Sequence, residues 1–200
     1  MRICFFGDSF VNGTGDDDCL GWTGRVCAAA RHMRHDVTHY NLGIRRDSSA
    51  DVAARWRREA ATRLPPDQDG RLVFSFGAND CMPDGAGGIR VAHEHTLANA
   101  RAILASSLAE WPTLMVGPAP VGDDASTDRR IKAVSVDLGQ VCAALGVPYL
   151  DVFDALLASE AWAREAALGD GSHPNSGGYA ALAGIVASWS AWRAWFGDTR

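Results

Sequence analysis

The sequence predicts an α/β fold in which helices cover both faces of a parallel sheet. Short apolar runs alternate with longer segments of helical periodicity five times along the chain. Of the 200 residues, 47% are hydrophobic and 22% are charged, which is typical of a globular domain. No internal repeat, low-complexity tract or Pro/Ser-rich linker divides the chain, so we expect a single domain over residues 1–200.

The individual elements follow from these runs. The apolar runs are bounded by turn residues and predict strands over residues 2–6, 37–42, 71–76, 113–117 and 148–152. The segments with helical spacing predict helices near residues 22–34, 50–63, 91–110, 127–145 and 176–196. The chain therefore repeats a strand followed by a helix.

One edge of this sheet is the expected place for function. In open α/β sheets, ligands bind outside the carboxyl ends of the strands. Segments 7–21, 43–49, 77–89 and 118–126 follow the first four strands, so we expect them to border one cleft.

Residues that could carry chemistry occur in four separate blocks, all on this predicted edge. The blocks are Gly7-Asp8-Ser9-Phe10, Asn41-Leu42-Gly43, Gly77-Ala78-Asn79-Asp80 and Asp170-Gly171-Ser172-His173-Pro174. Taken singly, Gly43 could simply end a strand, Asn79 could form an Asx turn, and His173 could cap a helix. Their joint occurrence at one edge favours a functional site.

The four blocks resemble those of the SGNH hydrolases, the GDSL-type esterases and lipases. That family is named for a Ser, a Gly, an Asn and a His, which here are Ser9, Gly43, Asn79 and His173. The resemblance covers essentially the whole chain, and Phe10 replaces the usual leucine after the serine. It implies a flavodoxin-like three-layer α/β/α sandwich with five parallel strands in the order 2-1-3-4-5, and hydrolysis of carboxylic esters.

Ester hydrolysis needs a nucleophile and a base that takes its proton. Ser9 is the candidate nucleophile, and we expect an acyl-enzyme intermediate on its hydroxyl. His173 is the candidate base, and Asp170 is expected to orient the imidazole and to stabilise the imidazolium. A spacing of three residues in a loop allows that last contact.

Hydrolysis also needs hydrogen-bond donors for the oxyanion. The N–H groups of Ser9 and Gly43 and the side-chain amide of Asn79 are the expected donors. Asp8 and Asp80 are expected to support the site by organising their turns.

The charge and the motifs of the sequence indicate which classes of ligand the protein binds. The net charge of −5 argues against nucleic acid. The acidic run 16–18 and the pair 123–124 lie in the expected edge loops, where they would repel anions and favour short neutral esters. Five widely spaced cysteines, with no CxxC pair, no phosphate loop and no HExxH helix, indicate neither a metal nor a cofactor.

Several alternatives stay open. Within the hydrolases these are a carbohydrate acetylesterase, an acyl-thioesterase and a lysophospholipase. Outside them, a flavodoxin-like fold could bind flavin. Trp189, Trp192 and Trp195 recur every three residues and form an apolar stripe, which could pack in the core, form a homodimer or serve as an interaction surface. The apolar run after Met1 is too short for a signal peptide or a membrane span, so we expect a cytoplasmic protein without membrane insertion.

Overall fold

The computed structural model describes residues 1–197 and contains one parallel five-stranded sheet. The strand order is β2-β1-β3-β4-β5, as the family resemblance implies. The strands are β1 (Arg2–Gly7), β2 (Thr38–Gly43), β3 (Gly70–Ser75), β4 (Thr113–Val116) and β5 (Tyr149–Leu150). Each overlaps the strand predicted from its apolar run.

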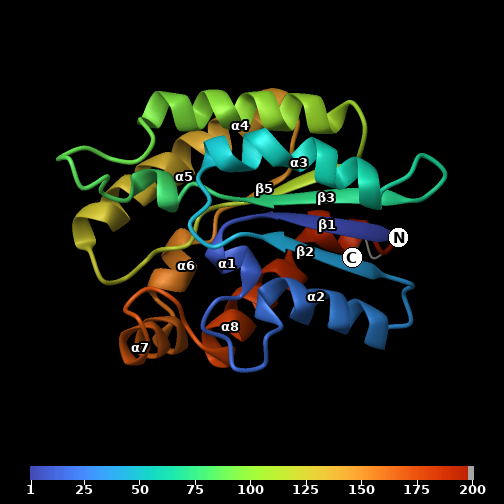
Figure 1. Ribbon diagram of the computed structural model, residues 1–200. Helices are drawn as coiled ribbons and strands as arrows, with labels where there is room; N and C mark the ends of the chain where they lie inside the picture. The colour runs from blue at the N-terminus through green and yellow to red at the C-terminus, as the bar shows by residue number, and fades with distance from the viewer. Residues whose placement is uncertain (198–200) are drawn as a thin grey trace.

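Helices cover both faces of the sheet (Figure 1). One face carries α3 (Ser49–Arg63), α4 (His93–Leu108) and α5 (Ala125–Leu145). The other carries α2 (Gly21–His32) and α8 (Ser176–Ser188). The protein is therefore a three-layer α/β/α sandwich, as predicted.

The central strand β1 shows why the apolar runs are continuous. Neighbouring side chains on a strand point to opposite faces, and here both faces are buried. Phe5 packs edge-on against Trp22 of α2, with ring centroids 5.5 Å apart. Phe6 stacks on Phe74 at 5.6 Å, beneath Trp56 of α3. Each buried aromatic side chain stabilises the fold by about 1.5–3 kcal/mol.

Local signals begin and end the long helices. At the start of α3, Ser48 and Asp51 form a capping box, in which each side chain accepts a hydrogen bond from the backbone N–H of the other. At the end of α5, Gly146 adopts a left-handed conformation with φ of 71°. These caps explain why both helices end within two residues of their predicted bounds.

The structure corrects the sequence prediction in the loops. The stretch after β5, expected to be irregular, contains α6 (Phe153–Leu157) and α7 (Glu160–Leu168). Two further short helices, α1 (Ser9–Asn12) and the 3-10 helix η1 (Asn79–Cys81), follow β1 and β3. These segments are too short for periodicity to reveal.

The predicted last helix is also divided. It ends at Ser188, and α9 (Ser190–Ala194) follows because Trp189 is extended, with ψ of 126°. Trp192 is buried, and its ring centroid lies 6.2 Å from that of Phe5. Trp189 and Trp195 are only partly buried. The central tryptophan of the stripe therefore packs in the core, and the homodimer stays a prediction.

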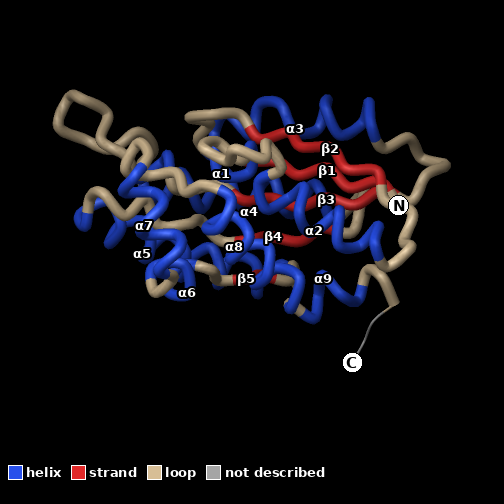
Figure 2. Tube along the Cα trace, turned by 90° about the horizontal axis from the view of Figure 1, so that it is seen from below, coloured by secondary structure: helices blue, strands red, loops and turns tan. Residues whose placement is uncertain are grey.

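The carboxyl ends of the strands lie at the edge of the sheet opposite the N-terminus (Figure 1). Figure 2, seen from below, shows loops and short helices gathered at that same edge. Within residues 1–197, no helix is both long and apolar enough to cross a membrane.

Candidate active site

The candidate nucleophile stands where β1 turns into α1. Asp8 is the N-cap of α1, and its carboxylate accepts the N–H of Phe10 at 2.9 Å. Gly7 is required because a Cβ there would lie 1.9 Å from the carbonyl oxygen of Ser75. Ser9 begins the helix, so its N–H has no partner within the helix.

Ser9, His173 and Asp170 form a continuous chain of contacts. The Ser9 Oγ lies 2.7 Å from His173 Nε2, and His173 Nδ1 lies 2.8 Å from Asp170 Oδ2. The Asp170 carboxylate also accepts the N–H groups of His173, at 2.9 Å, and Ser172, at 3.1 Å. The Phe10 ring packs 5.1 Å from the imidazole. The structure thus brings together three predicted residues separated by up to 164 positions.

These contacts keep Asp170 ionised. Partial burial by itself would raise the pKa of this carboxyl. The hydrogen bonds from the N–H and the imidazole of His173, and from Ser172, outweigh it and lower the pKa to about 2. A carboxylate therefore faces Nδ1 of His173 at any pH above that value.

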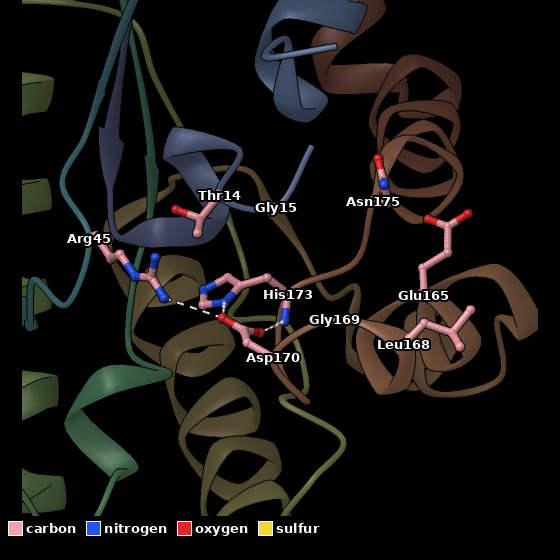
Figure 3. Close-up of a pocket in the computed structure, with 9 residues that line it drawn as sticks. All are labelled: Thr14, Gly15, Arg45, Glu165, Leu168, Gly169, Asp170, His173 and Asn175. Carbon is pink, nitrogen blue, oxygen red and sulfur yellow. Dashed lines mark hydrogen bonds and ion pairs between the residues drawn. The ribbon is translucent and has the colours of Figure 1, made fainter. Parts of the chain in front are cut away.

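Arg45 is a residue of the site that the sequence analysis missed. Its Nη2 lies 3.2 Å from Asp170 Oδ2 (Figure 3). Both side chains are substantially exposed, at 60% and 44%, so solvent screens the pair and its contribution to stability is small. No motif signalled this contact, because it joins positions 125 residues apart.

Asn79 and Gly43, the other two residues for which the family is named, differ in how their hydrogen-bond donors are used. Asn79 begins η1, and its side-chain amide donates to the carbonyl oxygen of Asp47 at 3.1 Å. An amide has two donor hydrogens, so one is left for a substrate. Asn79 thus follows the carboxyl end of β3 with one amide hydrogen uncommitted, and its role as an oxyanion donor stays a prediction.

The Gly43 N–H, expected to be a free donor, is already occupied. It donates to Asn41 Oδ1 at 3.0 Å. A Cβ on Gly43 would lie 2.2 Å from the backbone nitrogen of Asn12, so this glycine lets the end of β2 approach α1. The structure therefore gives Gly43 a packing role, and its role as an oxyanion donor stays a prediction.

Asp80 is a fully buried carboxylate that joins the starts of two helices. It accepts the N–H of Ser49, at 2.9 Å, and the Ser49 hydroxyl, both from α3. It also accepts the hydroxyl of Thr96 of α4 at 2.9 Å. Asp80 was expected to organise its own turn, whereas these hydrogen bonds connect it to α3 and α4.

Asp8 is also buried, but has fewer donors. Its burial raises the pKa to about 7, helped by the nearby negative charge of Asp80 and opposed by the N–H of Phe10. Near neutral pH it is therefore partly protonated.

Comparison with known proteins decides the family. Residues 5–181 match the family described as the GDSL-like Lipase/Acylhydrolase family. This chain belongs to that family. It is a GDSL-type carboxylic ester hydrolase.

Solved structures agree with this assignment in fold. An acetylxylan esterase, Axe2, from Geobacillus stearothermophilus has a TM-score of 0.79 and 17% identity, covering 95% of each chain. A lipase/acylhydrolase from Enterococcus faecalis has a TM-score of 0.72 and 24% identity, covering 96% of each chain. A G-D-S-L family lipolytic protein from Veillonella parvula has a TM-score of 0.73 and 18% identity, covering 93% of this chain and 96% of its own. The comparison with curated proteins gives no match.

In this GDSL-type hydrolase, a buried carboxylate ties the serine-bearing segment to the histidine-bearing segment. Asp16 accepts the N–H of Gly21 at 2.7 Å, the Ser176 hydroxyl at 2.7 Å and two guanidinium nitrogens of Arg25. Burial would raise its pKa, but these bonds, led by Arg25, lower it well below the usual range. Ser176 lies three residues after His173, so Asp16 holds that segment beside Ser9.

Two further contacts strengthen this connection. Asn175 accepts the N–H of Asp17 at 3.0 Å and donates to its carboxylate at 2.6 Å. Tyr179 donates its hydroxyl to the carbonyl oxygen of Thr14 at 2.7 Å. The acidic run 16–18 was expected to repel anionic ligands, yet Asp16 is buried and paired with Arg25.

A cavity of about 310 Å³ opens beside His173 and Asp170 (Figure 3). The rest of its lining combines backbone, polar side chains and one aliphatic side chain: Thr14, Gly15, Arg45, Glu165, Leu168, Gly169 and Asn175. Within residues 1–197, no group of three or more His, Cys, Asp and Glu side chains is arranged to hold a metal ion.

Proposed function

We propose that this hydrolase cleaves carboxylic esters through an acyl-enzyme intermediate on Ser9. The observation that carries the proposal is the chain of contacts at 2.7 and 2.8 Å from Ser9 Oγ through His173 to Asp170. Serine hydroxyls are weak nucleophiles until an adjacent base takes the proton, and His173 Nε2 lies within hydrogen-bond distance to do so.

The reaction then has two halves. Ser9 Oγ bonds to the ester carbonyl carbon while its proton passes to His173 Nε2. The tetrahedral intermediate collapses, the bond to the alcohol oxygen breaks, and His173 returns the proton to the departing alcohol. Water then attacks the acyl-serine with His173 again as base, which releases the carboxylic acid and restores the Ser9 hydroxyl.

Asp170 supports both halves. Its carboxylate holds the proton of His173 on Nδ1, which leaves Nε2 free to act as base. Related evidence comes from Axe2, in which alanine variants of a serine, and of an aspartate and a histidine three residues apart, are described as catalytic mutants. Asp170 and His173 have the same spacing.

The oxyanion formed on the carbonyl oxygen needs donors at the same place. The N–H of Ser9 and the second amide hydrogen of Asn79 supply two. In this class of site, one donor is typically worth about 3 kcal/mol in the transition state. Gly43 would contribute only if its N–H left Asn41.

We propose a short, uncharged acyl ester as substrate. Two exposed carboxylates lie near His173, since Asp170 contacts its imidazole and Asp123 accepts from Ser172, and they oppose anionic groups. A carbohydrate acetyl ester is the second candidate, because Axe2 is an acetylxylan esterase with the same fold. Flavin binding has no support from the family match.

Labelling with a fluorophosphonate tests the mechanism. The reagent phosphonylates serines activated by a neighbouring base, so we expect one label, mapped to Ser9 by peptide mass spectrometry. Ser106 is a matched internal control, because its hydroxyl donates to the helix backbone at 2.5 Å and has no adjacent base. A label elsewhere, or none on folded protein, overturns the proposal.

A further inference from the structure

The cavity beside His173 adjoins the catalytic residues, and the proposed acyl-transfer steps give it no role of its own. His173 and Asp170 form part of its wall, whereas Ser9 does not (Figure 3). In the proposed reaction the departing alcohol takes its proton from His173, so the alcohol oxygen lies next to this imidazole. The space that adjoins the imidazole is thus the space available to the alcohol.

The size of the cavity limits what it can hold. Its volume of about 310 Å³ lies at the lower end of the range for small-molecule sites. That is room for a compact ring or a short branched group.

Several hydrogen-bonding groups of its wall keep donors or acceptors that are available to a ligand. Arg45 uses one amino nitrogen on Asp170, and a guanidinium has five donor hydrogens. Glu165 accepts the N–H of Gly178 with Oε2 at 2.8 Å, which leaves Oε1 as an acceptor. Thr14 donates its hydroxyl to Asn12 and can still accept. The side-chain oxygen of Asn175 accepts from the N–H groups of Asp17 and Ser176, and its amide donates one hydrogen to Asp17, which leaves its second amide hydrogen as a donor.

The charges of the wall argue against two classes of ligand. Glu165 and Asp170 together outnumber the single guanidinium of Arg45, so an anionic alcohol is repelled. An alkyl chain would strip water from the Glu165 carboxylate and from Arg45 without replacing their hydrogen bonds, which is costly.

A hydroxylated, uncharged alcohol satisfies every feature. Its hydroxyls donate to Glu165 and accept from Arg45, as both groups require. Leu168, 81% exposed at the edge of the cavity, offers an apolar contact for the C–H face of a ring.

We propose that this cavity is a leaving-group subsite for a polyhydroxylated alcohol such as a sugar, with Arg45 and Glu165 as its specificity-determining residues. The inference rests on the proposed acyl-enzyme function, because it assigns the alcohol side of that reaction.

The test compares two acetyl esters that differ in the alcohol alone: a methyl glycoside carrying one acetyl group, and cyclohexyl acetate. Both deliver the same acetyl group to Ser9, so the ratio of their kcat/KM values reports on the alcohol subsite. We expect the wild-type ratio to favour the glycoside by about tenfold or more, as expected when a charged group hydrogen-bonds a hydroxyl.

Two variants probe the wall, with one matched control. Arg45→Met and Glu165→Gln should each lower this ratio by about tenfold, since each removes a charged partner of the hydroxyls. Glu165→Gln keeps an acceptor for the N–H of Gly178, so the fold is retained, as a melting temperature would verify. Glu160→Gln, on the same helix and 90% exposed, should leave the ratio unchanged.

Each outcome decides the matter. A wild-type enzyme that turns over p-nitrophenyl acetate but does not prefer the glycoside, or variants that leave the ratio unchanged, overturns the subsite alone. Loss of all ester turnover together with loss of fluorophosphonate labelling overturns the proposed function, and the subsite with it.

Discussion

Asp8 and Asp170 are two carboxyl groups at the same active site, and their pKa values shift in opposite directions. Asp8, at the end of β1, is fully buried, and its pKa rises to about 7. Asp170, in the loop before α8, is partly exposed, and its pKa falls to about 2. Burial raises the pKa of both groups, so burial alone does not explain the difference.

The donors around each carboxylate explain it. Asp170 accepts hydrogen bonds from two backbone N–H groups and an imidazole, and pairs with Arg45. Asp8 accepts chiefly from the N–H of Phe10 and lies near the negative charge of Asp80. The surroundings of Asp170 therefore stabilise its charged form, and those of Asp8 stabilise its neutral form. In the proposed mechanism, a suppressed charge beside Ser9 would avoid repulsion of the oxyanion.

Ser9→Ala should have the largest effect, because both halves of the proposed reaction pass through this hydroxyl. We expect turnover of p-nitrophenyl acetate to fall to background with an unchanged melting temperature. Adding Asp170→Asn to Ser9→Ala should cause no further loss, since residues that act as a unit are non-additive. Activity within about threefold of wild type would contradict the assignment of Ser9.

Asp170→Asn should rank next and separates the two carboxyl groups directly. Removing the charge leaves the wrong imidazole tautomer, and kcat should fall by about 10⁴. Asp8→Asn preserves an acceptor for the N–H of Phe10, so we expect kcat to fall by less than about tenfold. Equal losses in the two variants, measured with p-nitrophenyl acetate, would show that the difference in pKa has no catalytic meaning.

Asn79→Ala tests whether the oxyanion is stabilised from this side of the site. Loss of a donor that acts mainly in the transition state should lower kcat by about 10² and leave KM within a few-fold. Asn79→Asp should be at least as damaging, because it adds a negative charge where Asp8 suppresses one. Loss of activity only in proportion to loss of melting temperature would make Asn79 a turn-forming residue.

The smallest effect is on stability, and its pH dependence differs for the two carboxyl groups. Asp8 binds its proton more tightly when the protein is folded. Its contribution to the free energy of unfolding is therefore full below its unfolded pKa near 3.8 and is lost as pH rises towards 7. Asp170 has a lowered pKa, so its contribution is present above 3.8 and is lost as pH falls towards 2.

Urea unfolding between pH 4 and pH 8 measures the Asp8 contribution. The stability of Asp8→Asn relative to wild type should increase from pH 4 to about pH 7 and then level off, because the variant never carries the buried charge. A difference between Asp8→Asn and wild type that stays constant with pH would contradict the raised pKa.

Much of the fold could be predicted because its signals are local. The apolar run of β1 and the capping box at Ser48 each depend on residues close together in the sequence. The short helices α6 and α7 escaped prediction, since α7 is stabilised by Trp162, which packs 6.0 Å from Tyr179 of α8. The break at Trp189 likewise coincides with the packing of Trp192 against Phe5.

By itself, the sequence determined that Ser9 and Asn79 follow the first and third strands, and the family resemblance of its motifs made Asp170 and His173 their candidate partners. Tertiary structure alone decided how their hydrogen-bonding groups are used. It occupied the N–H of Gly43 with Asn41, paired Arg45 with Asp170, and buried Asp16 between Arg25 and Ser176. The physical reason is that a hydrogen bond and a pKa depend on the neighbours of a group in space. Arg45 and Asp170 are 125 positions apart along the chain and Asp16 and Ser176 are 160 apart, and packing of the layers brings each pair together.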